Sequence, residues 1–150
     1  MRVVIQRVGH ARIKNKKNEE RTIGPGMLIL LGIEENDTAK DCDWLCSKIS
    51  NLRIFDDENG KMNHSLMDVG GDIMVVSQFT LHASTKKGNR PSWIRAAAPD
   101  KAEPMYHSFI QTLTQHTGKE IVTGEFGAYM EISLLNDGPV TLFIDTKNKE

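Results

Sequence analysis

The sequence contains only two cysteines, Cys42 and Cys46, which lie four residues apart in a stretch with helical spacing. No second Cys or His pair follows at the spacing that a zinc site requires. We therefore expect two reduced thiols on one face of a helix, with no bound metal and no other cofactor.

Long hydrophobic runs are also missing, because no apolar stretch approaches the roughly 18 residues that span a bilayer. Residues 1–8 are too short and too charged to act as a signal peptide. These absences predict a cytoplasmic protein with no membrane partner.

The sequence has no excess of charge of either sign, since its formal net charge is −1 at pH 7. This balance excludes a protein that coats nucleic acid through bulk positive charge, so any contact with RNA has to be local. The clearest basic clusters are Lys14, Lys16 and Lys17, and then Lys86, Lys87, Arg90 and Arg95. Clusters of this kind are usually solvated loops.

Several catalytic motifs are absent: the Walker loop, G-x-G-x-x-G, H-E-x-x-H and the G-x-S-x-G nucleophile elbow. Ser77, Thr80 and His82 are close in sequence, which suggests a Ser/His/acid hydrolase. On a strand, however, Thr80 and His82 share a face with Gln78, whereas Ser77 faces the other way. A conventional triad is therefore disfavoured.

The length of 150 residues fits one domain, 1–150, with one core. Thr38 and Asp41 form a capping-box pattern before apolar residues at helical spacing, which predicts an amphipathic helix over 38–51. Pro99 and Gly118 are typical start and stop signals and predict a second helix between them.

Apolar and alternating runs predict the strands. We expect strands at 2–8, 10–13, 27–33, 53–55, 73–80, 120–125, 129–135 and 140–145, with a loop or short strand at 61–64. The polar residues 84–92 predict a long exposed loop. This order predicts an α/β fold in which two helices flank a mixed sheet or a partly closed β-barrel.

Residues 73–83 form the most informative stretch of the chain. Four apolar residues run directly into Ser77, Gln78 and Thr80, so a buried strand ends in polar side chains. An unpaired buried polar group costs about 1–3 kcal/mol. These side chains therefore either cap neighbouring backbone or line a pocket.

Residues 136–141 are a second informative stretch. Asn136, Asp137, Gly138 and Pro139 are typical of a hairpin turn. Glycine also has no Cβ, so backbone atoms at a Gly-Pro pair can touch a ligand directly. The residues alone leave both interpretations open.

Ser77-Gln-Phe-Thr-Leu-His-Ala83 and Asn136-Asp-Gly-Pro-Val-Thr141 together resemble motifs of the D-aminoacyl-tRNA deacylase family. Four further matches occur in consistent order: Leu52-Arg-Ile-Phe55, Gly60-Lys-Met-Asn63, Gly88-Asn-Arg-Pro-Ser92 and Gly124-Glu-Phe-Gly-Ala-x-Met130. The resemblance runs from Met1 to Asp145 and so covers nearly the whole chain.

The resemblance implies a homodimeric enzyme that hydrolyses the ester between a D-amino acid and the terminal adenosine of tRNA, without a metal. The residues it implies for the catalytic pocket, where backbone N–H groups meet the ester carbonyl, are Ser77, Gln78, Phe79 and Thr80. Phe126, Gly127 and Met130 would hold the adenosine. Gly138 and Pro139, as a cis pair from the partner subunit, would reject L-amino acids, and such a clamp would leave glycyl-tRNA cleavable.

Two other functions remain open on the sequence. Thr80 or Ser77 could form an acyl-enzyme, which predicts a trapped covalent adduct. A non-catalytic tRNA-binding module predicts binding without turnover.

Overall fold

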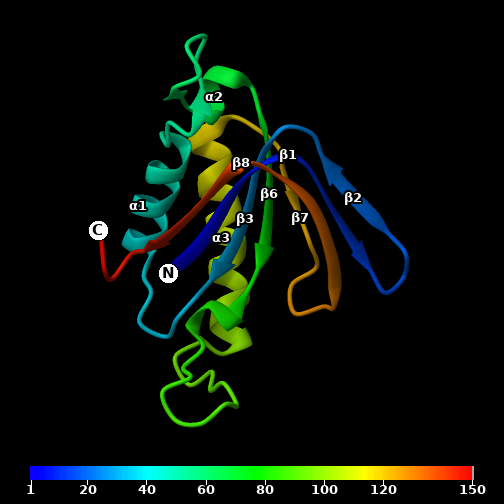
Figure 1. Cartoon of the computed structure of the whole chain (residues 1–150). Coiled ribbons are helices and arrows are strands. Elements are labelled where there is room, and N and C mark those ends of the chain that lie inside the picture. Colours follow the sequence, from blue (N-terminus) through cyan, green and yellow to red (C-terminus); the bar gives the residue numbers. More distant parts are fainter. Residues whose placement is uncertain (150) are drawn as a thin grey trace.

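The computed structural model describes residues 1–149 and contains one large mixed sheet. Five strands lie in the order β2-β1-β3-β6-β7, and β8 pairs with β1. Their bounds are β1 Arg2–Asn15, β2 Glu20–Ile23, β3 Gly26–Gly32, β6 Asp72–Ser77, β7 Ile121–Thr123 and β8 Met130–Asp145. β3, β6 and β7 run parallel to one another, and the other pairs are antiparallel. The sheet curves into a nearly closed barrel (Figure 1).

Two long helices, α1 (Ala39–Ser50) and α3 (Pro99–Thr117), pack against each other beside the sheet (Figure 1). A short helix, α2 (Leu66–Val69), and a small sheet of β4 (Phe55–Asp56) and β5 (Met62–His64) complete this end of the molecule. The predicted mixed sheet or partly closed barrel with two flanking helices is confirmed. None of the helices in residues 1–149 is long and apolar enough to cross a membrane.

Local signals define both long helices. The side chain of Asp41 accepts hydrogen bonds from the backbone N–H and the hydroxyl of Thr38, which completes the predicted capping box. Gly118 ends α3 in the left-handed conformation at φ 64°, where glycine is favoured over other residues. The observed helices begin and end within one residue of the predicted bounds.

The sheet separates two hydrophobic clusters. One lies between the sheet and the helices and contains the largest buried side chain, Phe109. The Tyr106 hydroxyl donates to the Val75 carbonyl at 2.8 Å, which ties α3 to β6 and satisfies a buried polar group. The other cluster, around Leu28 and Met74, lies on the opposite face, inside the curve of the sheet. Both cysteines are buried free thiols of the first cluster, as predicted.

The terminal strands differ from the prediction in their length. The expected return at 10–13 does not occur, because β1 continues to Asn15, and the expected strands 129–135 and 140–145 are one strand, β8. β1 pairs with β8 along almost its whole length, and the pairing is interrupted by a bulge in β8. Gln6 faces Thr141 and Val8 faces Asn136, which leaves residues 137–140 opposite the single Arg7.

Two shorter predictions also need correction, and two short elements were missed. The strand expected at 73–80 ends at Ser77, and Phe79–His82 form a 3-10 turn, η1. The strand expected at 120–125 is only the three residues of β7, because just Ile121–Thr123 pair with β6. β2 and α2 were not predicted: β2 follows a polar run, and α2 has only four residues, too few for a helical period to show.

Candidate active site

The candidate site begins where β3 and β6 stop pairing. Leu31 and Ser77 are the last partners of this parallel pair, and the Gln78 N–H then donates to the Leu31 carbonyl at 2.7 Å. That bond holds the strand end in place while the chain turns into η1. The sequence predicted that Thr80 and His82 share a strand face with Gln78. That prediction is wrong, because residues 79–82 form the 3-10 turn η1 and not a strand.

Beside η1 lies a largely apolar cavity of about 370 Å³. Its walls come from the end of β3, the start of η1, the segment before α3, and the loop between β7 and β8. The lining residues are Leu31, Ile33, Ser77, Gln78, Phe79, Trp93, Ala96, Ala97, Pro99, Ala102, Phe126 and Gly127. The cavity can therefore accept an apolar group whose polar end meets the turn at Ser77–Phe79.

Two backbone donors are unoccupied at this turn. The first N–H groups of a helix have no partner within the helix, and those of Phe79 and Thr80 also have none elsewhere in residues 1–149. The Gln78 N–H is already used by Leu31, so it is not available. An oxygen bearing negative charge can therefore be stabilised by the N–H groups of Phe79 and Thr80.

The Thr80 hydroxyl has no base beside it. Its oxygen accepts a hydrogen bond from the side-chain amide of Gln78. His82 is the last residue of η1, and its side chain is buried, with only 1% of its surface exposed. The predicted weakness of a Ser/His/acid arrangement therefore agrees with the geometry, since none of the hydrogen bonds joins His82 to Ser77 or Thr80 among the described residues.

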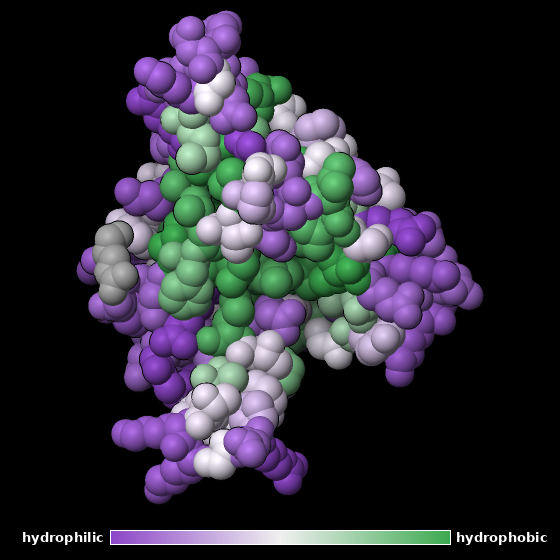
Figure 2. Space-filling view, viewed as in Figure 1, coloured by the Kyte–Doolittle hydropathy of each residue, from purple (hydrophilic) through white to green (hydrophobic). Residues whose placement is uncertain are grey.

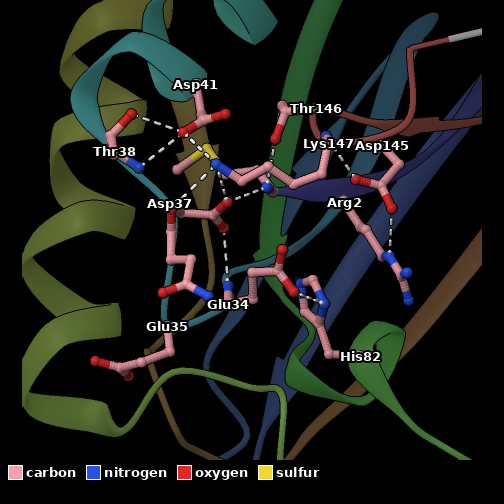
Figure 3. Close-up of polar contacts among 12 residues, drawn as sticks. Arg2, Glu34, Glu35, Asp37, Thr38, Asp41, His82, Asp145, Thr146 and Lys147 are labelled. Atoms are coloured by element: carbon pink, nitrogen blue, oxygen red, sulfur yellow. Dashed lines mark hydrogen bonds and ion pairs between the residues drawn. The ribbon is translucent and has the colours of Figure 1, made fainter.

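His82 belongs instead to a polar group around the chain termini (Figure 3). Its Nδ1 lies 3.7 Å from the nearer Glu34 oxygen, and neither ring nitrogen has a hydrogen-bond partner in residues 1–149. Arg2 donates to Asp145 at 2.8 Å and to the Leu81 carbonyl at 3.0 Å, so β1 also holds the far end of η1. Burial raises the pKa of Asp145, but hydrogen bonds from the Lys147 N–H and from Arg2 outweigh it, and the pKa stays below its usual value.

The three residues expected to hold the adenosine are divided between two cavities. Phe126 and Gly127 line the cavity beside η1. Phe126 also lines a second, more polar cavity of about 390 Å³, and Met130 lies only on that side. The ring of Phe126 stands 5.7 Å from that of Tyr106, which supports it from α3. Phe126 is thus the wall that the two cavities share.

Gly138 and Pro139 are exposed and line neither cavity. The peptide bond between them is cis, as the resemblance implied. The Arg7 guanidinium supports this loop from inside: it donates to the Asp137 carbonyl at 3.2 Å and to the Ile54 carbonyl at 2.8 Å, and it pairs with the Asp137 carboxylate at 3.0 Å.

Arg7 is a functional candidate that sequence reasoning missed. The alternation of β1 places it on the face of Val3 and Ile5, which are fully buried, and only 6% of Arg7 is exposed. An arginine on the buried face of a strand needs acceptors, because an unpaired buried charge is expensive. The sequence signal was therefore present, although its partners could be found only from the structure.

Among residues 1–149, no three His, Cys, Asp or Glu side chains gather closely enough to hold a metal ion. The candidate site described above consists of two backbone donors at the rim of a largely apolar cavity. This combination suits an enzyme that binds a carbonyl group and acts on it through backbone contacts.

A model of the D-Tyr-tRNA(Tyr) deacylase family matches residues 4–145. The D-aminoacyl-tRNA deacylases of Bacteroides thetaiotaomicron and Flavobacterium johnsoniae are 61% and 58% identical to this chain over 150 residues, which is all of each chain. The chain therefore belongs to the D-Tyr-tRNA(Tyr) deacylase family.

Two solved structures share the fold. One, described as c-Myc DNA Unwinding Element Binding Protein, has a TM-score of 0.91 and 41% identity, and the match covers 97% of this chain and 98% of the other. The second, a probable eukaryotic D-amino acid tRNA deacylase, has a TM-score of 0.82 over 95% of this chain and 97% of the other. At 17% identity this second likeness shows the fold alone.

We predict that His82 makes the protein less stable in mild acid. Burial lowers the pKa of His82 below its ordinary value of 6.5, and Arg2 acts in the same direction, whereas the nearby backbone of Gly32 and the Glu34 carboxylate oppose them. Below pH 6.5 the unfolded chain binds a proton that the folded protein excludes until the lower folded pKa is reached. The free energy of unfolding should therefore fall as the pH drops below about 6.5.

Urea unfolding between pH 7.5 and pH 5 measures this effect. His82→Gln removes the titration and should give a shallower loss of stability than wild type, whereas His10→Gln, which removes an exposed imidazole, is the matched control. Equal slopes for wild type and His82→Gln would contradict the prediction.

Proposed function

We propose that this protein hydrolyses the ester bond between a D-amino acid and the terminal adenosine of tRNA, releasing the free amino acid and the tRNA. Membership of the family and the activity of the named relatives, D-aminoacyl-tRNA deacylases, support the substrate class. The observation that carries the proposal is the pair of unoccupied N–H groups, on Phe79 and Thr80, at the rim of a cavity. Cytoplasmic action fits a substrate used in translation.

The proposed reaction places the ester carbonyl oxygen against those two N–H groups. Water attacks the carbonyl carbon, and the carbonyl oxygen becomes an oxyanion held by the backbone. The intermediate then expels the ribose oxygen, which takes up the proton that the attacking water gives up. One such donor is worth about 10²–10³ in rate. The neighbouring ribose hydroxyl of the substrate helps to place the water. An aminoacyl ester is already activated, so the proposal needs neither a side-chain nucleophile nor a metal.

Ser77 and Gln78 are proposed to complete the catalytic pocket with Phe79 and Thr80. Ser77 and Gln78 line the cavity, and the Gln78 amide is bonded to Thr80, which fixes the turn that carries the donors. The proposed adenosine contacts are Phe126, Gly127 and Met130. The position of Phe126 between the two cavities supports a base on one side and the aminoacyl group on the other.

Gly138 and Pro139 are proposed to act on the substrate of a second subunit in a homodimer. They do not line the cavity of their own chain, and they are exposed. The face that carries them also exposes Leu135 (56%) and Phe143 (59%) of β8, and Figure 2 shows hydrophobic residues gathered across the middle of this face. A second copy of the chain would cover this surface and bring its Gly-Pro loop to the cavity.

Selection in this proposal works by rejection. Backbone carbonyls of Gly138 and Pro139 would hold the α-amino group, and an L side chain would collide with them, whereas a D side chain would point outward. Glycine has no side chain to reject, and a steric pocket discriminates poorly against a smaller ligand. Glycyl-tRNA should therefore be a substrate too.

Hydrolysis of four tRNA esters tests the activity and its selectivity together. D-Tyrosyl-tRNA and glycyl-tRNA should be cleaved, and L-tyrosyl-tRNA and L-alanyl-tRNA should be spared, with rates lower on the order of 10²-fold or more. Loss of the ester is followed with labelled amino acid, and tRNA without enzyme gives the background rate. Equal rates on D- and L-tyrosyl-tRNA, or no hydrolysis by folded protein, would overturn the proposal. If D-tyrosyl-tRNA is cleaved but glycyl-tRNA resists hydrolysis as L-alanyl-tRNA does, the D side chain is recognised directly and the clamp is wrong.

Thr80→Ala should keep activity within about tenfold of wild type, because alanine retains the backbone N–H that the proposal uses. The kcat is measured on D-tyrosyl-tRNA, with thermal unfolding to check the fold. A loss of roughly 10⁴-fold or more with the fold intact, or a covalent adduct found by mass spectrometry, would favour the acyl-enzyme alternative. Binding of tRNA without any turnover by wild type would favour the binding module.

Gly138→Ala should lower activity on D-substrates by on the order of 10²-fold without admitting L-substrates. Gly138 has φ 125°, and a Cβ there would come within 2.8 Å of the Val140 side chain and 3.1 Å of Arg7. Gly60→Ala is the control, since Gly60 also has a positive φ but nothing within 4 Å. A fully active Gly138→Ala variant would contradict the clamp.

The composite site requires a dimer at the concentration used in the assay. A fully active monomer, found by sedimentation at that concentration, would contradict it.

A further inference from the structure

The segment 84–95, called the basic loop below, projects from the end of the molecule next to the candidate site (Figure 1). Paired hydrogen bonds between the backbones of Ser84 and Ser92, at 2.8 and 2.9 Å, close its base. Arg95 donates to Glu34 at 2.9 Å and holds the loop to the end of β3. The base is thus built into the fold, while every residue of the loop is exposed.

The loop carries positive charge that nothing in the described part of the chain neutralises. Lys86, Lys87 and Arg90 form no ion pair or hydrogen bond within residues 1–149. The sequence has no Asp or Glu anywhere from residue 73 to residue 99. Figure 2 shows hydrophilic residues projecting at the bottom of the view, where Figure 1 draws the basic loop.

The second basic cluster, in the connection from β1 to β2, has acidic residues beside its lysines. Glu19 and Glu20 lie within it, and Glu20 pairs with Arg12 at 3.5 Å. Neither carboxylate has a counterpart in the basic loop. The net charge of the protein is only −1, so an anionic partner would be attracted to the basic loop by local charge.

An aromatic pair stands between the basic loop and the cavity. The rings of Phe79 and Trp93 meet edge to face with their centroids 5.3 Å apart, and both residues line the cavity. They nevertheless expose 54% and 40% of their surface, so they form its mouth. Ile94 beside them is 92% exposed. Exposed aromatic rings beside unpaired cations are the combination that binds single-stranded nucleic acid, through base stacking and phosphate contacts.

We propose that the basic loop and the Phe79–Trp93 pair bind the single-stranded nucleotides that precede the terminal adenosine of the tRNA. Lys86, Lys87 and Arg90 contact the phosphates, and Trp93 stacks on a base. This inference rests on the proposed function, which places the terminal adenosine and its ester at the cavity. It adds a site for the strand that leads into that cavity, and it explains how a protein without bulk positive charge binds an RNA end.

The test compares a substrate that has the RNA nucleotides before the terminal adenosine with one that lacks them. D-Tyrosyl-tRNA has the phosphates, whereas D-tyrosyl-adenosine has the same ester and base without them. For the double variant Lys86→Gln/Lys87→Gln, the KM for D-tyrosyl-tRNA should rise roughly tenfold or more at 0.1 M salt, with kcat unchanged. The slope of log KM against log salt should fall by about 1.4, or 0.7 for each lost phosphate contact. Both constants for D-tyrosyl-adenosine should stay at wild-type values.

Lys40→Gln/Lys61→Gln is the matched control, because it removes the same charge from two exposed lysines outside the basic loop whose ammonium groups have no partner within residues 1–149. Trp93→Leu should raise the KM for D-tyrosyl-tRNA as well, but without changing the salt slope. An unchanged KM in the basic-loop variant, or the same increase in the control, would overturn the proposal.

Failure of the proposed function can be separated from failure of this inference. If wild type cleaves neither substrate, the proposed function fails. The basic loop is then tested alone by measuring the Kd for uncharged tRNA of wild type and of the same two double variants. Weaker binding only in the basic-loop variant supports the RNA site. Binding of wild type to phosphatidylserine vesicles, but not to tRNA, would assign the loop to an anionic membrane surface and overturn the inference.

Discussion

The parallel pairing of β3 with β6 is the constraint on which the candidate site depends. A parallel pair carries no tight turn at its end, so the chain leaving β6 is free to change conformation where the pairing stops. The single bond from the Gln78 N–H to the Leu31 carbonyl marks that point, at 2.7 Å. Beyond it the 3-10 turn begins, and its first N–H groups face no backbone acceptor. The polar end of a buried strand thus becomes a pair of donors beside a cavity.

A buried cation organises the Gly-Pro loop in a similar way. Arg7 cannot remain inside the fold without acceptors, and four residues of β8 bulge opposite it to provide some of them. The bulge carries Gly138 and Pro139 on its outer side, where they are exposed. The turn beside the cavity and the Gly-Pro loop therefore have different origins. The turn carries unused backbone donors, whereas the loop is supported by a side chain whose acceptors are all supplied by the fold.

Much of this arrangement could be predicted from the sequence, and the failures share a physical cause. Capping signals defined α1 and α3, since Thr38, Asp41 and Gly118 act through local contacts. The irregularity at residues 137–140 was different, because its neighbour is β1, more than 120 residues away in the sequence. A Gly-Pro pair within a hairpin turn and one within a bulge have the same local chemistry. Only the pairing partner distinguishes them, and the same is true of Arg7 and its acceptors.

The pairing of β1 with β8 also has a consequence for the order in which the chain folds. On the ribosome β1 is made before the other strands and β8 after them, so one edge of a 14-residue strand stays open while all the residues between them are made. Unpaired strand edges are templates for association between chains. Contacts between such distant residues also slow folding, because the intervening chain has to be ordered first. Any chain made only as far as the residues before β8 therefore exposes this edge, and truncation before β8 would leave it open permanently.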